Sequence, residues 1–493
     1  MSNKSIKKNY IFNLIVNLTN LLIPLVTAPY LSRILQVEGV GVKSYTLSIV
    51  SNFILFATLG MAEYGQIEVA RHRDDKYKYS KKIYELGLLR CISTIIVIGI
   101  YIITFSSELI NTQYNEIYTI LIINILANVL DFSWVLRGME DFKPISIAQI
   151  ISKIFMLIAT FAFVKTSNDL NIAVLINSLN ILLNSILILP ILKKYCIKVK
   201  LKDIKIFSNL RDSFVYFIPS IAIQIYTVLD KTMIGIITNS NVENGVYEQA
   251  DKIVKIVLTV VSTVNTIMSS RIAYLVRTKK ENEIQVLVKK STSLCMLIAL
   301  PITFGTIVIA DYFIPVFFGE GYDKAVNVLR ILSPLAIIIG LSGVVGSHYY
   351  TPFLKKRMSN KYLIAGAITN FFMNILLIKN FKSIGAAIAT ICAELVVTSL
   401  YIIKCDKKIF NMKLCIKSSY KYLIASVSMA IIILFVKNIL QISILSICIL
   451  GVIGMVSYGL ILLLLKDEYL YSILSDLGGK INEKIKFRRG NKM

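Results

Sequence analysis

The sequence lacks every motif that would point to covalent chemistry. It has no G-x-x-x-x-G-K-[S/T] phosphate-binding loop and no H-E-x-x-H metal motif, and its only histidines are His72 and His348. Without the phosphate-binding loop, an ATPase is excluded. The seven cysteines stand singly and no C-x-x-C pair occurs, so their spacing indicates neither a zinc site nor a disulfide framework. We therefore expect no catalytic residue, no bound metal, no cofactor and no enzyme activity.

Acidic residues are also scarce. The 493 residues include 29 Asp and Glu against 54 Lys and Arg, which gives a formal net charge of +25. Such an excess could serve nucleic-acid binding, but the basic residues form no single patch with interleaved aromatic residues. They fall in short clusters between apolar blocks, as expected of cytoplasmic loops in a membrane protein. Nucleic acid is therefore not an expected partner.

Apolar residues dominate the chain instead. They make up 56% of it, the mean hydropathy is +0.69, and they come in long blocks, which is typical of a membrane protein. Each block approaches the roughly 20 residues that a helix needs to cross a bilayer. We count fourteen, centred near residues 21, 52, 95, 126, 155, 181, 225, 263, 299, 340, 368, 393, 429 and 455. No small-residue cleavage pattern follows the first block, so we interpret it as a retained helix rather than a signal peptide.

Charge alternates from loop to loop. Residues 71–82 contain six Lys and Arg, residues 193–211 contain seven and residues 271–290 contain six, whereas residues 106–116 and 239–249 contain none. Because basic loops stay in the cytoplasm, this alternation predicts an even number of spans with both termini in the cytoplasm.

The basic loop near residues 193–212 divides the chain after six spans, so the second half starts from the same side as the first. The run IPLVTAPYLSRIL near Pro24 is echoed by IPSIAIQIYTVLD near Pro219, and GVGVKSYTLSIV (39–50) is echoed by NGVYEQADKIVKIV (244–257). We expect an all-α polytopic protein in which two six-helix lobes, related as parallel repeats, surround a central cavity. The predicted parts are lobe 1–195, a basic cytoplasmic linker 196–212, lobe 213–404, two additional transmembrane helices 405–466 and a basic cytoplasmic tail 467–493.

A polar stripe runs along the first block. Asn13, Asn17, Asn20, Pro24 and Thr27 follow one another at steps of 4, 3, 4 and 3, which keeps them on one helix face. Shorter stripes recur in spans 4, 6, 7, 8 and 11, the last of them formed by Asn370 and Asn374. Hydrogen bonds between packed helices would explain one such stripe. Several stripes in both halves that end at charges favour a hydrated passage between the lobes.

Ionisable residues at membrane depth are rare and usually functional. Basic residues outnumber acidic ones here, which suits an anionic head group, because Arg binds phosphate with two parallel hydrogen bonds and Lys acts as a point charge. Snorkelling to lipid head groups is the alternative for residues near span ends. The cationic candidates are Arg33, Arg90, Lys153, Lys231 and Lys255. Asp230 and Lys231 are neighbours about 100° apart on a helix, so we expect each to need a separate partner.

Four runs carry a family resemblance: NLTNLLIPLVTAPYLSRILQVEGVGVKSYTLSIV (17–50), FATLGMAEYGQIEVARHRDD (56–75), DFSWVLRGMEDFKPISIAQIISKI (131–154) and IPSIAIQIYTVLDKTMIG (218–235). They resemble Wzx-type polysaccharide flippases of the multidrug/oligosaccharidyl-lipid/polysaccharide exporter superfamily. The resemblance implies transport of an undecaprenyl-diphosphate-linked oligosaccharide from the inner to the outer leaflet of a bacterial cytoplasmic membrane, by alternating access. It implies that Arg33, Arg90, Lys153 and Lys231 receive the diphosphate and acidic sugars. A polysaccharide polymerase and glycosyltransferases are the protein partners that we expect besides membrane lipids.

Four other functions compete with this hypothesis. An antiporter for cationic drugs should bury more acid than base, and the reverse is seen. Fourteen spans are shared with lipid II flippases, so that substrate stays open. A membrane polymerase or ligase usually needs a sizeable external loop, which is absent, and a scaffold would not need so many intramembrane charges. An ion gradient could drive transport, with Asp131, Asp230 or Glu394 as proton or sodium sites.

Overall fold

The structure is a computed structural model that describes residues 3–106, 114–278 and 280–467. Helices make up nearly all of this part of the chain, and it contains no strand, so the all-α prediction is confirmed. Ten of the described helices are long and apolar enough to cross a membrane, or eleven if the bent pair Leu201–Ile225 and Thr227–Thr238 counts as one span. The predicted tail lies outside the described residues from position 468 onward.

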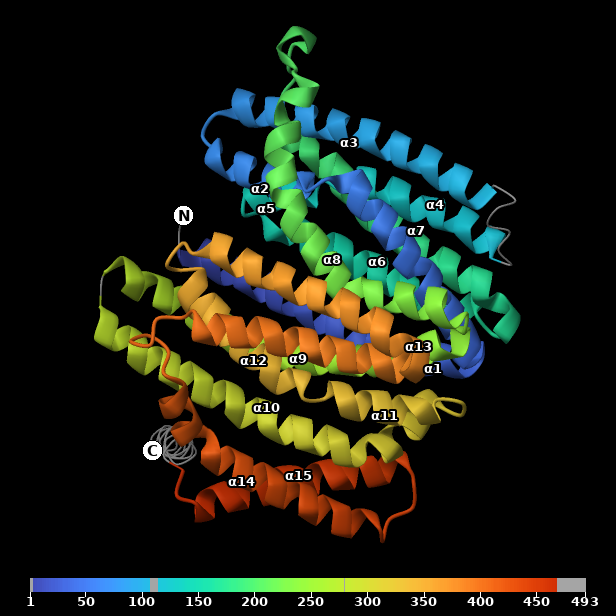
Figure 1. The fold of residues 1–493 in the computed structure, drawn as a ribbon. Coiled ribbons are helices and arrows are strands. Elements are labelled where there is room, and N and C mark those ends of the chain that lie inside the picture. Colours follow the sequence, from blue (N-terminus) through green and yellow to red (C-terminus); the bar gives the residue numbers. More distant parts are fainter. Residues whose placement is uncertain (1–2, 107–113, 279, 468–493) are drawn as a thin grey trace, which may run out of the picture. The chain divides into compact units, whose positions relative to one another are not determined.

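The described residues of the first half form seven α-helices and three 3₁₀ turns (Figure 1). They are α1 (Asn3–Thr58), α2 (Met61–Arg71), α3 (Lys76–Ser106), α4 (Asn115–Val129), α5 (Ser133–Gly138), α6 (Phe142–Phe163), η2 (Ser167–Asp169), α7 (Leu170–Tyr195), η3 (Leu201–Asp203) and η4 (Ile206–Asn209).

The second half forms eight α-helices and one π-helical turn. They are α8 (Leu210–Thr238), α9 (Asn241–Arg277), α10 (Glu281–Phe318), α11 (Asp323–Leu332), α12 (Leu335–Val345), the π turn η5 (Gly346–Tyr350), α13 (Lys356–Ile403), α14 (Met412–Lys437) and α15 (Ile444–Leu464).

Two of these helices each hold two predicted spans. Helix α1 contains a non-helical residue at Gln36, and α13 contains one at Lys382. The predicted centres near 21 and 52 fall on the two sides of the first break, and those near 368 and 393 fall on the two sides of the second. All fourteen predicted centres lie on described helices, so the arrangement is compatible with fourteen spans, although the count itself stays a prediction.

The chain divides into two compact units. The first contains Met1–Gln249, Phe318–Ala325 and Leu363–Ala393. Within it, α1 packs against α3, α4, α6 and α8, and α7 packs against α4 and α6; Figure 1 shows α3, α4 and α7 side by side. Its apolar core includes Val50, Tyr101 and Ile125, which are fully buried and join α1, α3 and α4. Helix α8, which carries the ionisable residues Asp230 and Lys231, is thereby held against α1.

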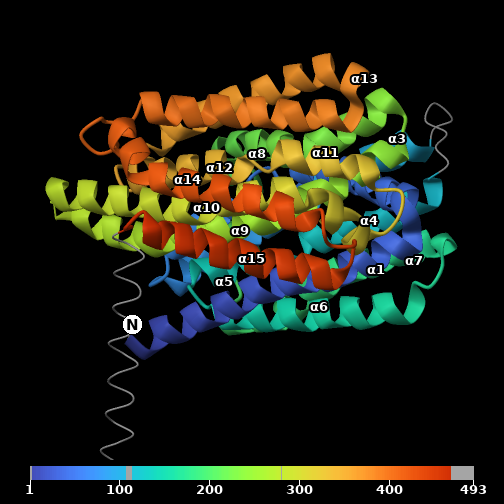
Figure 2. The same ribbon diagram turned by 90° about the horizontal axis from the view of Figure 1, so that it is seen from below.

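The second unit contains Ala250–Phe317, Val326–Tyr362 and Glu394–Met493. Within it, α14 and α15 lie side by side (Figure 2), and their apolar faces pack on α10 through Val308, Met429 and Leu450. Helix α14 begins at a local cap, because the Asn411 side chain accepts hydrogen bonds from the amides of its first turn. Buried Lys437, at the end of α14, binds Asp311 of α10 with an Nζ–Oδ2 distance of 2.6 Å.

Candidate functional site

A buried carboxylate on α8 is the most distinctive polar feature of the first unit. Asp230 is 4% exposed, and its Oδ2 accepts hydrogen bonds from the Tyr247 hydroxyl and the Thr390 hydroxyl, each at 2.6 Å. Its Oδ1 accepts a third, also at 2.6 Å, from Nδ2 of Asn374. The Asn374 amide also donates to Oδ1 of Asn370 at 3.1 Å. Helices α8, α9 and α13 therefore meet at one carboxyl group.

No cation accompanies this carboxylate, and the site holds spare polar atoms. All three of its partners are neutral hydroxyl or amide groups. The Asn374 Oδ1 and Asn370 Nδ2 atoms are buried without a hydrogen-bond partner among the described residues. Because unpaired buried polar atoms are costly, such a group suggests a site that an additional ligand completes. Carboxylate, amide and hydroxyl oxygens suit a proton or a hard cation.

Lys231 points to a different neighbour, as the spacing of adjacent helical residues predicts. Its Nζ lies 2.5 Å from Oε2 of Glu248, and the two side chains are 13% and 20% exposed. The same Oε2 accepts a hydrogen bond from the Ser44 hydroxyl at 2.9 Å. The ammonium group therefore joins α8 to α9, and through Glu248 to α1.

A row of polar contacts continues between α1 and α8. The Ser48 and Thr232 hydroxyls are 2.9 Å apart, Asn52 donates to Thr232 at 3.3 Å, and Gln224 reaches Asn52 at 3.5 Å. Gln224 belongs to the polar stripe that the sequence predicts for span 7. Gln224 therefore takes part in hydrogen bonds between helices, which is the alternative weighed for a single stripe. The Ser220 and Thr227 hydroxyls of the same stripe donate to carbonyl oxygens within α8. The side chains of Asn13 and Asn17, from the stripe in the first block, lie outside the described residues.

The turns of the two echoed hairpins interlock through glycines. A Cβ atom on Gly41 would lie 1.7 Å from the Asn241 carbonyl oxygen, and one on Gly245 would lie 2.1 Å from the Val37 carbonyl oxygen. Gly41 and Gly245 occupy matching positions in the echoed runs GVGVKSYT and NGVYEQAD. We call these reciprocal backbone approaches the hairpin contact. Only glycine permits backbones to come this close.

A second buried carboxylate lies beside the hairpin contact. Glu243, at the start of α9, is 2% exposed. Its Oε1 is 2.8 Å from Nζ of Lys324, and its Oε2 accepts a hydrogen bond from the Ser383 hydroxyl at 2.6 Å. The three residues come from α9, α11 and α13, so this cluster fixes the second half of α13 to the hairpin contact.

Two predicted site residues meet at the break between α4 and α5. Buried Arg90 of α3 donates through Nη1 to the Asp131 carbonyl oxygen at 2.8 Å and through Nη2 to the Asn128 side chain. The Asp131 carboxylate accepts the Ser133 amide hydrogen at 2.9 Å, at the start of α5. In this structure Arg90 and Asp131 therefore support the backbone of the break.

The remaining predicted residues are scattered. Arg33 is exposed on α1 beside Gly319, and Lys153 is half-buried on α6 without an acidic partner in the described part of the chain. In the second unit, exposed Lys255 pairs with Asp251 one turn away at 2.7 Å. Glu394 is 4% exposed there, and its carboxylate makes no hydrogen bond to any described residue. Among the described residues of the first unit, the predicted site residues therefore come together as two pairs, Asp230 with Lys231 and Arg90 with Asp131.

Sequence reasoning missed several residues of the site. Tyr247, Thr390 and Glu243 stand in unremarkable contexts, and nothing in their spacing points to Asp230 or Lys324. Asn370 and Asn374 did give a signal, because their spacing of four residues places both on one face of α13. This polar face had to contact another polar group, and the Asp230 carboxylate required hydrogen-bond donors.

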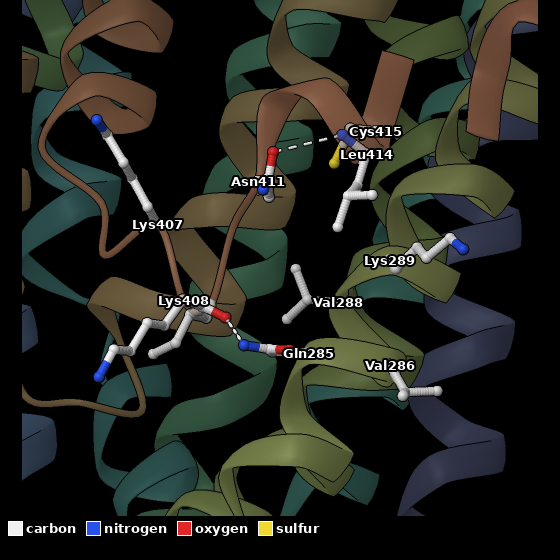
Figure 3. Close-up of a pocket in the computed structure, with 10 residues that line it drawn as sticks. Gln285, Val286, Val288, Lys289, Lys407, Lys408, Asn411, Leu414 and Cys415 are labelled. Atoms are coloured by element: carbon white, nitrogen blue, oxygen red, sulfur yellow. Dashed lines mark hydrogen bonds between the residues drawn. The ribbon is translucent and has the colours of Figure 1, made fainter. Parts of the chain in front are cut away.

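A hollow of about 210 Å³ in the second unit does not form a binding site for anions, although three lysines line it. Figure 3 shows the side chains of Lys289, Lys407 and Lys408 pointing away from one another and from the hollow. Gln285 is engaged with the Lys408 carbonyl oxygen, and Asn411 caps α14. No polar group is left to converge on a ligand there.

Cysteine and metal chemistry add nothing to the site. Burial raises the pKa of the Cys405 thiol, in the loop before α14, to about 12, so this thiol stays protonated and unreactive. Among the described residues, no group of three or more His, Cys, Asp and Glu side chains could hold a metal ion.

Comparisons with known proteins agree with this architecture. The chain is 28% identical over 401 residues to a putative O-antigen transporter of Escherichia coli K12, which covers 80% of the chain and 95% of the relative. It is 26% identical over 200 residues, 40% of the chain and 42% of the relative, to the probable low-salt glycan biosynthesis flippase Agl15 of Haloferax volcanii.

Solved structures show the same fold. The lipid II flippase MurJ in an inward closed conformation superposes with a TM-score of 0.73 at 16% identity, covering 92% of this chain and 97% of that one. An inward-facing multidrug transporter of the MATE family gives 0.60 at 13% identity, covering 82% and 96%. At such identities these likenesses concern the fold alone. The model of the polysaccharide biosynthesis protein family matches residues 6–270, more than half of the chain, and the protein therefore belongs to that family.

Proposed function

We propose that this protein is a flippase that moves an undecaprenyl-diphosphate-linked oligosaccharide repeat unit from the inner to the outer leaflet of the bacterial cytoplasmic membrane. Family membership supports this, as do relatives named for O-antigen transport and glycan flipping, one of which the chain covers over 95% of its length. The ten helices of membrane-spanning length among the described residues suit such a transporter. The lipid tail stays in the bilayer while the glycan passes through the protein.

Two other substrates are less well supported. Likeness to MATE transporters and to MurJ rests on identities of 13% and 16%, which carry the fold but not the substrate. The relatives matched over most of their length are O-antigen transporters, at 28% and 20% identity. A polysaccharide repeat unit is therefore preferred over a drug cation or lipid II.

The observation that carries the mechanism is the buried Asp230 carboxylate with neutral partners. Hydroxyl groups donate or accept, so Tyr247 and Thr390 satisfy both an ionised and a protonated carboxyl group by rotating. The same oxygens, with the amide oxygen of Asn374, would surround a small cation. We place the coupling proton or sodium ion at this carboxyl group.

Occupancy of this site acts on helix packing. Asp230 belongs to α8, whereas Thr390 and Asn374 lie on the two sides of the break in α13. Adding a proton removes the negative charge that orients these donors, and the contact between α8 and α13 weakens. Differential ion affinity between two packings is what allows an ion gradient to drive alternating access.

The diphosphate requires cations that are not already neutralised. Lys153 fits this role best, because it is half-buried and has no acidic partner in the described part of the chain. Lys231 would have to leave Glu248, and Arg90 would have to leave the backbone of the α4–α5 break, before either could bind phosphate. We therefore rank Lys153 first.

Transport of a lipid-linked glycan in reconstituted vesicles tests the proposal. Exposure of the glycan on the opposite leaflet is followed with a membrane-impermeant reagent, with and without an imposed proton or sodium gradient. Asp230→Asn keeps the size of the side chain and should abolish the response to the gradient. Asp251→Asn, which removes an acid from the i, i+4 pair with Lys255, serves as the matched control. Gradient-dependent transport by Asp230→Asn would refute the coupling site, and no transport by the unaltered protein would refute the function.

A further inference from the structure

The segment that leads from α7 into the first residues of α8, residues 196–212, presents an unusual outer surface. Leu201 is 85% exposed and Phe207 is 66% exposed, although both are large apolar residues. Lys198, Lys200 and Lys202 lie before and after Leu201 and are exposed. Asp203, between the two apolar residues, accepts a hydrogen bond from the Tyr77 hydroxyl. None of these three ammonium groups has an acidic partner among the described residues. Large apolar side chains are poorly suited to bulk water, and here lysine ammonium groups surround them.

Hydrogen bonds attach this segment to α3. The Ile197 amide donates to the Ser80 hydroxyl at 3.1 Å, and the Lys205 amide donates to Oε1 of Glu85 at 3.0 Å. The Asn209 side chain donates to the other oxygen of Glu85 at 2.8 Å. The segment is therefore fixed by its inner face along the first turns of α3.

Apolar contacts complete the attachment. Cys196, Ile206 and Leu210 pack against the buried cluster that includes Tyr79 and Ile83 of α3. In Figure 1 the green segment between α7 and α8 projects sideways from α3, across the direction of the helix. Its exposed residues are consequently held out to one side of the helices, which is where lipid surrounds a membrane protein.

The surface next to this segment changes from basic to apolar along a groove. A groove of about 360 Å³ between α6 and α7 has Lys143 and Lys194 at the end from which the segment starts. Ile147, Ile151 and Ile191 line the rest of the groove. Asp141 also lines it, and its carboxylate accepts a hydrogen bond from the Tyr195 hydroxyl. Basic residues thus give way to apolar ones along these helices, as they do at a head-group boundary.

We propose that residues 196–212 form an interfacial anchor that binds anionic phospholipids of the cytoplasmic leaflet. Leu201 and Phe207 insert between acyl chains, and Lys198, Lys200 and Lys202 contact lipid phosphates. Charge complementarity selects this occupant, because the cytoplasmic leaflet is anionic and basic segments beside membrane helices bind it. Amphipathic elements with apolar and basic faces lie in the interface for the same reason. The anchor fixes the junction of the two halves to the membrane surface, whatever substrate is carried.

Fluorescence quenching in nanodiscs of the full-length protein tests this inference. Trp134 is the only tryptophan, so Trp134→Phe provides a silent background for Leu201→Trp. The discs contain phosphatidylglycerol and phosphatidylcholine with brominated acyl chains, and iodide serves as the aqueous quencher. We expect strong quenching by brominated lipid and weak quenching by iodide. Strong iodide quenching without lipid quenching would overturn the anchor, because the surface would then face water or a soluble partner.

The role of the lysines needs a charge-matched comparison. The triple change Lys198→Gln, Lys200→Gln and Lys202→Gln should reduce lipid quenching, and discs of phosphatidylcholine alone should reduce it equally. A control triple with the same loss of charge is Lys407→Gln, Lys408→Gln and Lys413→Gln, exposed residues of the second unit in the loop before α14 and in its first turn. The control should retain the quenching of the parent. Equal quenching in all variants and both lipid mixtures would overturn the recognition of anionic lipid by these lysines.

Discussion

Replacing Gly41 by alanine should open the hairpin contact. The added Cβ would lie 1.7 Å from the Asn241 carbonyl oxygen, 2.6 Å from its carbonyl carbon and 2.9 Å from the Gly245 nitrogen. All three are backbone atoms, so no flexible side chain can give way. Ordinary contact begins at 3.4 Å, and the α1 and α9 backbones must therefore separate. The closed arrangement seen here is incompatible with any side chain at position 41.

The size of the effect follows from overpacking. Forcing one extra carbon into a packed contact costs about 1–3 kcal/mol, and the backbone partners here place the cost at the upper end. Such a penalty shifts a two-state equilibrium about 5- to 150-fold. Alanine gains roughly 0.5–1 kcal/mol over glycine within a helix, which offsets part of the cost. The net cost is then about 2–2.5 kcal/mol, and we expect a shift of roughly 30- to 70-fold towards an open hairpin contact.

Amide hydrogen exchange measures this shift directly. Residues 37–45 and 241–249 should exchange roughly 30- to 70-fold faster in Gly41→Ala, since exchange reports the population of the open state. Gly245→Ala, which meets the Val37 carbonyl oxygen at 2.1 Å, should act in the same direction. Gly99→Ala is the matched control, because no atom lies within 4 Å of a Cβ at that helical position. Unchanged protection of both segments in Gly41→Ala would refute the reasoning.

Three further predictions concern buried charges, each read from the thermal unfolding midpoint in detergent. Arg90→Lys loses the pair of hydrogen bonds from one guanidinium group to the α4–α5 break. The free energy of unfolding should fall by about 1–3 kcal/mol, and an unchanged unfolding midpoint would contradict that role. Glu248→Gln should cost a similar amount, about 1–3 kcal/mol, by leaving Lys231 without its counter-charge, and adding Lys231→Met should recover most of it. Lys437→Met should cost only about 1 kcal/mol because its partner Asp311 is 39% exposed, and a double-mutant cycle with Asp311→Asn that gave no coupling would count against the pair.

Much of the architecture could be predicted from the sequence, because long apolar blocks in a membrane have few alternatives to helices. The break in α1 at Gln36 and the turn between α8 and α9 correspond to the two echoed hairpins. The echo in sequence gives each hairpin a Gly-Val pair, Gly41-Val42 in the first and Gly245-Val246 in the second. The echo could not reveal that each glycine packs against the other hairpin. A repeat in sequence indicates that two segments are similar, and it does not indicate that they are in contact.

The partners of the charged residues could not be predicted. Asp230 binds Thr390, 160 residues further along the chain, and Glu243 binds Ser383 across 140 residues. Such pairs arise from how helices pack, and single residues of ordinary type give no periodic signal. Arg90 illustrates the converse case, since an intramembrane arginine suggested substrate binding, whereas its hydrogen bonds support a helix break. The sequence position of a charge within an apolar block therefore does not show which group it contacts.

The adjacency of Asp230 and Lys231 has a consequence for coupling. One carboxyl group binds α13 through Thr390 and Asn374, while the next residue along α8 binds Glu248 on α9. A rotation or shift of α8 that releases the first contact therefore also displaces the second, because a helix moves as a rigid element. The position of α8 then determines two things together: the state of the ion site proposed at Asp230, and whether Lys231 can bind an anionic head group. Under this arrangement, a proton or cation bound at Asp230 changes anion affinity without touching the anion, which is the reciprocity that coupled transport requires.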